Sequence, residues 1–181
     1  MEFEFEYKGL ITKEAFLKII EKCDVEKVID QKNTYFETTD GYFKLNNSAL
    51  RVRSKNNGFE LTLKVKKDLG NVEYNFEIDI TTYLDMVHEK KVPDILFDYI
   101  DHDLVLENLS QINTMRHVIK YGDHIVELDQ TDFDGIVDYE IEIESNSIDH
   151  AKEVFKSFAN DLGVTYTESK PKIERYHEYH K

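Results

Sequence analysis

Hydrophobic and polar residues alternate along much of the chain, which is the pattern of β-strands with one buried face. The first run covers residues 3–8, where aromatic side chains alternate with charged ones. The same alternation predicts further strands over residues 49–54, 61–66, 72–80, 112–121, 124–130, 137–144 and 164–167. Turn signals between them, at Asn56-Asn57-Gly58, at Asp68 to Asn71, at Gly122-Asp123 and at Asp134-Gly135, predict hairpins and an antiparallel sheet.

A period of three to four residues replaces this alternation in other places and predicts helices. One helix is expected over 13–23, with Thr12 as its N-cap, and another over 147–162, ended by Gly163. Residues 82–101 predict two short helical segments separated near Pro93. We interpret residues 173–181 as a short polar tail and the whole of 1–181 as one α+β domain.

Composition and charge narrow the classes of function. The 181 residues include 37 Asp and Glu against 23 Lys and Arg, for a net charge of -14, which disfavours nucleic acid and anionic membranes as partners. The single cysteine, Cys23, excludes an internal disulfide framework and fits a small buried hydrophobe in a reducing compartment. The opening MEFEFEYK lacks the apolar run of a secretory signal, and no stretch approaches a membrane span. We therefore expect a cytoplasmic protein.

The polar faces of the predicted strands carry full charges of both signs, whereas an ordinary solvated face would be expected to carry neutral polar groups as well. The acids are Glu4, Glu6, Glu73, Glu77, Glu127, Asp129, Glu140, Glu142 and Glu144, and the bases are Lys8, Arg51, Arg53, Lys64, Lys66, Arg116 and Lys172. Carboxylates two residues apart on one face lie about 7 Å apart and repel each other. Inside a closed barrel, a metal-bound polyphosphate would satisfy both sets of charges. A solvated, charged surface remains the alternative.

Five motifs, taken in order, resemble the CYTH superfamily, also called the triphosphate tunnel metalloenzymes. The family signature ExExK is matched by Glu4-Phe5-Glu6-Tyr7-Lys8. The later motifs are LRVR at 50–53, LTLK at 61–64, VELDQTDFDGIVDYEIEIE at 126–144 and SKPKIERY at 169–176. The set spans nearly the whole chain and looks most like the small stand-alone branch of Gram-positive bacteria.

This resemblance implies an eight-stranded antiparallel β-barrel whose lumen holds the charges, with helices packed outside. Family members hydrolyse or rearrange triphosphates with Mg²⁺ or Mn²⁺. The resemblance implies metal ligands at Glu4, Glu6, Asp129, Glu140 and Glu142, and at Glu73 or Glu77, between which the sequence does not decide. It implies triphosphate binding by Lys8, Arg51, Arg53, Lys64, Arg116 and Lys172, with Lys66, Lys170 and Arg175 as neighbouring candidates. The catalytic residues implied are Lys8, Arg53, Asp129 and Glu142.

The leading functional hypothesis is metal-dependent hydrolysis of a triphosphate, with inorganic tripolyphosphate as the substrate, because no platform for an organic base stands out. The alternatives are a thiamine or nucleoside triphosphatase, a class IV-like adenylyl cyclase, a module that binds polyphosphate or a nucleotide without turnover, and an acidic structural barrel. The proposed chemistry is attack of an activated water on the terminal phosphorus. The sequence leaves open whether the barrel forms a homodimer.

Overall fold

The structure is a computed structural model that describes residues 2–55, 58–67 and 70–181, apart from the side chains of residues 2–4, 55, 70, 108 and 109. The turn predicted at Asn56-Asn57-Gly58 and part of the connection from Asp68 to Asn71 fall outside these residues. The strands are β1 (Glu2–Ile11), β2 (Val25–Thr38), β3 (Ser48–Lys55), β4 (Gly58–Lys67), β5 (Gly70–Ile78), β6 (Leu106–Tyr121), β7 (His124–Phe133), β8 (Ile136–Ser145) and β9 (Thr167–Glu168). The helices are α1 (Lys13–Lys22), α2 (Tyr42–Leu45), α3 (Ile80–Leu84), α4 (Ile148–Leu162) and α5 (Lys172–Tyr179), with a π-helical turn at Asp85–Glu89 and a 3₁₀ turn at Asp94–Leu96.

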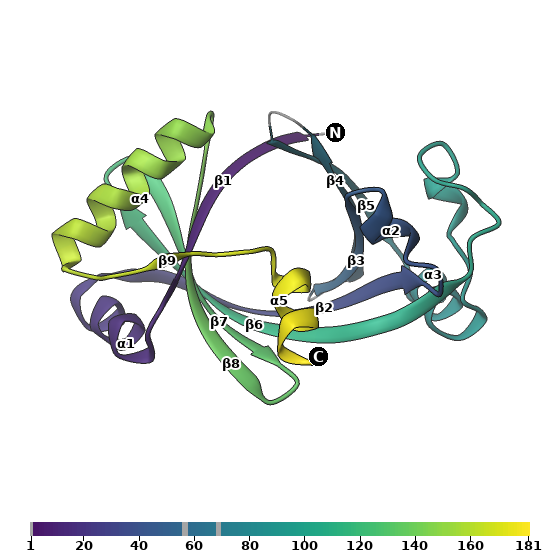
Figure 1. The fold of residues 1–181 in the computed structure, drawn as a ribbon, viewed down its shortest axis with the longest axis horizontal. Coiled ribbons are helices and arrows are strands. Elements are labelled where there is room, and N and C mark those ends of the chain that lie inside the picture. Colours follow the sequence, from purple (N-terminus) through teal and green to yellow (C-terminus); the bar gives the residue numbers. More distant parts are fainter. Residues whose placement is uncertain (1, 56–57, 68–69) are drawn as a thin grey trace. The chain divides into compact units, whose positions relative to one another are not determined.

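The strands pair in the order β5-β4-β3-β2-β6-β7-β8-β1-β9, and β5 also pairs with β1 (Figure 1). The order therefore closes on itself through eight strands, and the two-residue strand β9 is added beside β1. The α+β fold class predicted from the sequence, an antiparallel barrel with helices outside, is confirmed, with one short strand more than the eight expected. None of the described helices has the length and apolar character needed to cross a membrane.

The contacts divide the chain into two compact units. Unit 1 contains residues 1–3 and 32–111, and unit 2 contains residues 4–31 and 112–181. Strands β1, β2 and β6 pass from one unit into the other. This division does not test whether the chain folds as one domain, so that expectation stays a prediction.

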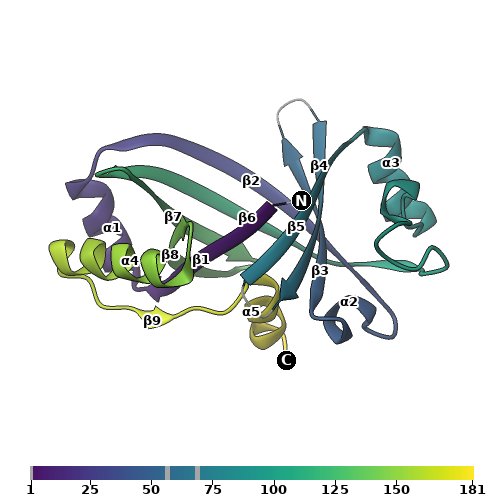
Figure 2. The same ribbon diagram turned by 90° about the horizontal axis from the view of Figure 1, so that it is seen from above.

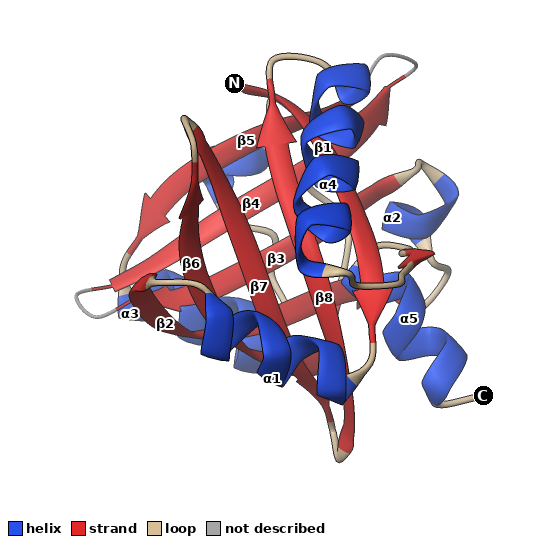
Figure 3. Ribbon diagram, turned by 90° about the vertical axis from the view of Figure 1, so that its left-hand side faces the viewer, coloured by secondary structure: helices blue, strands red, loops and turns tan. Residues whose placement is uncertain are grey.

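In unit 2, helices α1 and α4 cover one face of the sheet (Figure 3). Their apolar side chains, such as Phe16 and Phe155, pack against the apolar positions of β8, such as Ile141 and Ile143. Gly9 makes close packing possible, since a Cβ at this position would lie 2.7 Å from Cζ of Phe155. Because side chains alternate along a strand, the charged positions of the same strands lie on the opposite face.

In unit 1, strands β2 to β5 lie beside helices α2 and α3 (Figure 2). Its core contains Leu50 and Val52 of β3, Leu61 and Leu63 of β4, and Met86 from the π-helical turn. Because Arg51 and Arg53 alternate with the buried residues of β3, they lie on the other face of this sheet.

Most predicted elements are confirmed, including α1 with Thr12 as its N-cap and α4 with Gly163 at its end. Helical turns also occur on either side of Pro93, as predicted. Four segments differ from the sequence analysis. The strand expected at 164–167 is wrong over 164–166, since β9 contains only Thr167–Glu168, and the short helix α2 was not predicted. Residues 25–38 form a long strand that the pattern did not predict, because residues 33–36 are buried one after another and do not alternate. The prediction of a polar tail at 173–181 is wrong, since residues 172–179 form α5.

Candidate metal and phosphate site

Three carboxylates gather on the charged face of unit 2. Cross-strand pairing puts Asp129 of β7 opposite Glu140 of β8, and Glu142 follows two residues later on the same face. One oxygen from each of the three carboxylates lies within 4.8 Å of the others. Asp129 and Glu140 are 0% exposed and Glu142 is 6% exposed. Buried oxygens this close form a donor set suited to a hard divalent cation.

Two cationic side chains hold this set of carboxylates. Nζ of Lys172 lies 3.0 Å from Oδ2 of Asp129 and 2.7 Å from Oε1 of both Glu140 and Glu142. The guanidinium of Arg116 donates two hydrogen bonds to Asp129, at 2.8 and 2.7 Å, and one to Glu142 at 2.5 Å. Arg116 also forms an ion pair with Glu127. The structure thus brings together candidate residues of β6, β7, β8 and α5 that lie far apart in the sequence.

The ExExK strand supplies a third cation to the same cluster. Nζ of Lys8 donates to Oε1 of Glu142 at 3.2 Å and forms an ion pair with Glu6 at 3.0 Å. The register explains this contact, because Lys8 lies directly opposite Glu142 in the pairing of β1 with β8. The side chain of Glu4 lies outside the described residues.

The carboxylates and cations shift one another's protonation. Burial raises the pKa of Glu142, but Lys172, Lys8 and Arg116 outweigh it, so that this pKa lies well below its usual value. Burial lowers the pKa of Lys172, but the neighbouring carboxylates Glu140 and Glu142 have the larger combined effect. The pKa of Lys172 therefore lies well above its usual value. Burial raises the pKa of Glu127 to about 7, with Arg116 opposing the shift. Glu142 and Lys172 are therefore charged near neutral pH.

A second polar cluster lies in unit 1 and contains the paired arginines. Nε of Arg53 donates to Oδ1 of Asn33 at 3.0 Å. Nη2 of Arg51 lies 3.4 Å from Oγ1 of Thr62, which in turn donates to Oδ1 of Asn75 at 2.8 Å. The buried Nε of Arg51 has no hydrogen-bond partner. An unsatisfied buried donor is costly, and an anionic ligand would satisfy it.

Lys64 and Glu73 complete the cluster in unit 1. Their ion pair, 2.9 Å between Nζ and Oε1, joins residues that are directly paired across β4 and β5. Glu73 is buried at 6% exposure, whereas Glu77 is exposed. Of the two candidate acids in β5, Glu73 is therefore the buried one.

The other candidates from the sequence are exposed, apart from Arg175. The exposed side chain of Lys170 bonds to Glu178, while Lys66 and Glu144 are also exposed. Arg175 is buried at 2% exposure, and its guanidinium bonds to Asp138 and Glu140.

Sequence reasoning missed several neutral and acidic members of the two clusters: Asn33, Thr62, Asn75, Asp138 and Ser169. The position of Asp138, two residues before Glu140 on the same strand face, could have indicated its place. The neutral residues gave no such signal, because alternation alone does not separate them from a solvated face.

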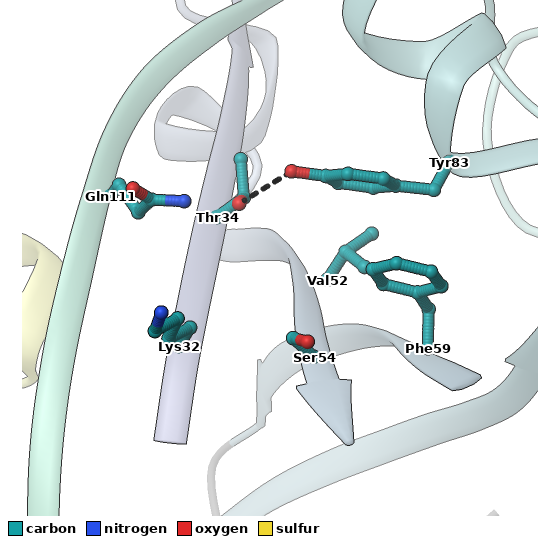
Figure 4. A pocket seen from close by; sticks show the side chains of 7 residues that line it. All are labelled: Lys32, Thr34, Val52, Ser54, Phe59, Tyr83 and Gln111. Carbon is teal, nitrogen blue, oxygen red and sulfur yellow. Dashed lines mark hydrogen bonds between the residues drawn. The ribbon is translucent and has the colours of Figure 1, made fainter. Parts of the chain in front are cut away.

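A separate pocket of about 120 Å³ lies within unit 1 (Figure 4). It is lined by Lys32, Thr34, Val52, Ser54, Phe59, Tyr83 and Gln111. The Oγ1 of Thr34 and the hydroxyl of Tyr83 are hydrogen bonded at 3.1 Å, and the ring of Tyr83 stacks on Phe59. Since Val52 and Ser54 alternate with the arginines of β3, this pocket lies on the other face of the sheet from Arg51 and Arg53.

Comparison with known proteins identifies the family of this chain. The model of the CYTH domain matches residues 2–177. A Bacillus subtilis (strain 168) protein provisionally named triphosphatase YjbK is 30% identical over 98% of this chain and 95% of its own. The crystal structure of a Bacillus halodurans protein, provisionally called an adenylate cyclase, is 32% identical with a TM-score of 0.85 and covers 96% of this chain and 97% of that one.

A structure from Hippeastrum has the same fold, with a TM-score of 0.82 at 23% identity, over 97% of this chain and 95% of that one. That protein, HpAC1, is provisionally called an adenylyl cyclase and is described as having a dominant triphosphatase activity. The ExExK strand, the closed antiparallel sheet and the match over residues 2–177 agree with one another. The chain belongs to the CYTH family.

Proposed function

We propose that this protein hydrolyses a triphosphate with the help of a divalent metal ion, and that its substrate is inorganic tripolyphosphate. The observation that carries this proposal is the set of three buried carboxylate oxygens within 4.8 Å of one another, from Asp129, Glu140 and Glu142. Such a set suits a divalent cation, and the arginines of unit 1 suit phosphate oxygens. The name of the Bacillus subtilis relative, a triphosphatase, supports the same reaction class.

The metal ion would be Mg²⁺ or Mn²⁺, held by Asp129, Glu140 and Glu142 and by the two acids of the ExExK strand, Glu4 and Glu6. These residues fit such an ion because their carboxylates supply hard oxygen ligands, and because Asp129, Glu140 and Glu142 are buried. When bound, the ion would supply Lewis-acid activation of a phosphoryl oxygen and of water.

The protein's own cations would bind and stabilise the phosphates. Arg51 and Arg53 would bind phosphate oxygens, and the buried, unpartnered Nε of Arg51 is a donor that such an oxygen would satisfy. Lys8 and Lys172 would act as point charges beside the leaving phosphates. In our assignment the substrate displaces part of the ion pairing that these lysines make with Glu142.

Carboxylates of the same cluster would orient the attacking water. We assign this role to Asp129 and Glu142, whose oxygens lie beside the candidate metal position. The water oxygen forms a bond to the terminal phosphorus while the bond from phosphorus to the bridging oxygen breaks. The products are orthophosphate and diphosphate, and the proton of the water passes to a carboxylate or to solvent.

The choice of tripolyphosphate rests on the chemistry of the two clusters. Their charged side chains recognise phosphate oxygens, and inorganic tripolyphosphate needs no contact beyond these. An adenylyl cyclase is the second candidate, because the Bacillus halodurans protein, 32% identical, carries that name.

The test is release of orthophosphate from tripolyphosphate, ATP and thiamine triphosphate with Mg²⁺ or Mn²⁺, and of cyclic AMP from ATP. We expect release from tripolyphosphate to exceed that from the other substrates, to be lost in chelator and in Glu142→Gln, and to be lowered in Arg53→Ala through a higher KM. Matched controls are Glu153→Gln and Lys120→Ala, which change exposed side chains and should leave the rate unchanged.

Cyclic AMP and diphosphate as the main products would replace the hydrolase by a cyclase. Tight binding of tripolyphosphate without turnover would replace it by a binding module. Equal activity of the wild type and both site variants would show that the phosphate release comes from a contaminating enzyme. That result would contradict the proposal.

A further inference from the structure

Arg175 of α5 is the most fully bonded cation beside the carboxylate cluster. Nε donates to Oδ2 of Asp138 at 2.8 Å. Nη1 donates to Oε2 of Glu140 at 2.7 Å, to Oγ of Ser169 at 2.5 Å and to the carbonyl oxygen of Lys170. Nη2 is 3.2 Å from Oε1 of Glu140 and 3.4 Å from Oδ1 of Asp138. A guanidinium has five N–H donors, and the acceptors around this one account for all of them.

This saturation argues against the role that the family resemblance implies, which is contact with the triphosphate, because Arg175 is also more deeply buried than Lys172. The residue is 2% exposed, and a phosphate could take a donor from it only by breaking one of its bonds to Asp138, Glu140, Ser169 or the carbonyl of Lys170. We propose that Arg175 is a positioning residue that acts through Glu140, holding that carboxylate in place as a metal ligand. This inference rests on the proposed function, since it assumes that Glu140 binds the metal.

The geometry at Glu140 shows how the residue would act. Both oxygens of this carboxylate accept from Arg175, while Oε2 also accepts from Ser169 and Oε1 from Lys172, the contact that a metal ion would replace. Bidentate pairing fixes the plane of a carboxylate, whereas a point charge such as Lys172 does not. Groups that bond to a metal ligand in this way commonly change metal affinity about 10- to 100-fold when they are removed.

Arg175 also attaches α5 to the sheet. The experiment must separate this structural role from the positioning of Glu140. Its guanidinium lies 5.4 Å from the ring centre of Phe133, and Tyr179 on the same helix donates to Oδ2 of Asp138 at 2.9 Å. Tyr179→Phe therefore loosens the attachment of α5 at Asp138 without removing any bond to Glu140. It is the matched control for loss of Arg175.

The experiment measures binding of Mn²⁺ alone to the full chain by electron paramagnetic resonance, without any triphosphate. We expect Arg175→Met to weaken Mn²⁺ binding about tenfold or more, and Arg175→Lys to weaken it similarly because an ammonium cannot pair in a bidentate way. Tyr179→Phe should bind Mn²⁺ like the wild type. In a Glu140→Gln background, Arg175→Met should cause little further loss, because the two changes act through one carboxylate.

Three outcomes would overturn the inference. One is unchanged Mn²⁺ binding in Arg175→Met and Arg175→Lys together with a raised KM for tripolyphosphate, which would make Arg175 a substrate ligand. Another is an equal weakening of Mn²⁺ binding by Tyr179→Phe, which would mean that Arg175 only attaches α5 to the sheet. The third is full additivity with Glu140→Gln. If Arg175→Met does not fold, Arg175→Lys carries the test.

Failure of the proposed function gives a different result. Binding of Mn²⁺ that depends on Arg175 through Glu140, in a wild type that releases no phosphate from any triphosphate, would refute the hydrolase and leave the positioning role intact. A wild type that binds no Mn²⁺ at all would overturn both.

Discussion

The two polar clusters use the same strand alternation but hold their charges in different ways. In unit 2, the carboxylates of Asp129, Glu140 and Glu142 are buried among lysine and arginine side chains, and each carboxylate has more than one cationic contact. In unit 1, neutral oxygens of Asn33 and Thr62 accept from the two arginines, and the one buried acid described there, Glu73, pairs with Lys64. The first arrangement concentrates negative oxygens suited to a metal, and the second orients positive donors suited to an anion.

This difference suggests a division of labour within the proposed function. A carboxylate beside several cations cannot be removed without leaving buried positive charges uncompensated, whereas a neutral acceptor can be removed at the cost of one hydrogen bond. Variants in unit 2 should therefore affect stability and metal binding most strongly. Variants in unit 1 should affect triphosphate affinity.

The largest effect is expected from Glu142→Gln. The change removes the negative charge that Lys8, Arg116 and Lys172 share, and loss of one partner from a buried ion pair typically costs about 3–5 kcal/mol. We expect the free energy of unfolding, measured by urea denaturation in the presence of chelator, to fall by about 3 kcal/mol. Glu153→Gln, at an exposed position of α4, should change it by less than about 0.5 kcal/mol. Equal stability of the two variants would show that the ion pairs of unit 2 are not coupled as the distances indicate.

A smaller effect, with a different signature, is expected from Arg53→Ala in unit 1. Loss of a charge-assisted hydrogen bond to phosphate is worth about 1.5–3 kcal/mol, so that the KM for tripolyphosphate should rise roughly 10- to 100-fold. Binding of Mn²⁺ alone should stay as in the wild type, because Arg53 lies in the other cluster. Arg53→Lys, which keeps the charge, should recover part of the affinity. A loss of Mn²⁺ binding equal to that in Glu142→Gln would break the comparison between the units.

The neutral partners of unit 1 allow a finer test through Thr62→Val. This change keeps the volume of a residue that is 2% exposed and removes the hydroxyl between Arg51 and Asn75. We expect a loss of about 1 kcal/mol in the free energy of unfolding and a rise in KM of a few-fold, because Arg51 keeps its charge. Thr81→Val, at an exposed position of α3, is the matched control. A loss as large as that of Glu142→Gln would mean that the neutral contacts are not the weaker ones.

The sequence predicted the fold well wherever apolar and polar residues alternate or apolar residues recur at helical spacing. Strands β3, β4, β7 and β8 alternate cleanly, and α4 has both a Ser147 N-cap and a Gly163 end. Strand β2 was missed because the sequence of its second half, with polar Gln31 and Asn33 and adjacent Tyr35 and Phe36, has no period of two.

Helix α5 was missed for a different reason. Its mean hydropathy is low, and its stabilising contacts are ion pairs of Lys172 and Arg175 with acids more than thirty positions earlier in the chain. The local sequence pattern gives no information about such ion pairs, because they depend on where β8 places Glu140. For the same reason the sequence could identify Arg175 as a candidate cation, but not as one whose donors are already used.

The smallest effect concerns Glu127 and the pH dependence of stability. Burial raises the pKa of Glu127 to about 7 in the folded protein, above its usual value. The folded state therefore keeps a proton that the unfolded chain releases, so that the contribution to stability is present below about pH 4.5 and is lost as pH rises towards 7. Because this side chain is 33% exposed, we expect the change to be under about 1 kcal/mol.

The measurement is urea unfolding of the wild type and Glu127→Gln between pH 4.5 and 8, with chelator present. The free energy of unfolding of the wild type should fall relative to that of Glu127→Gln as pH rises through this window, and then stay constant. Since Glu127 pairs with Arg116, the opposite slope would mean that the ion pair outweighs burial and that Glu127 is a charged member of the cluster. Unit 2 would then hold one more permanent negative charge beside its candidate metal position, and the contrast with the neutral acceptors of unit 1 would be sharper.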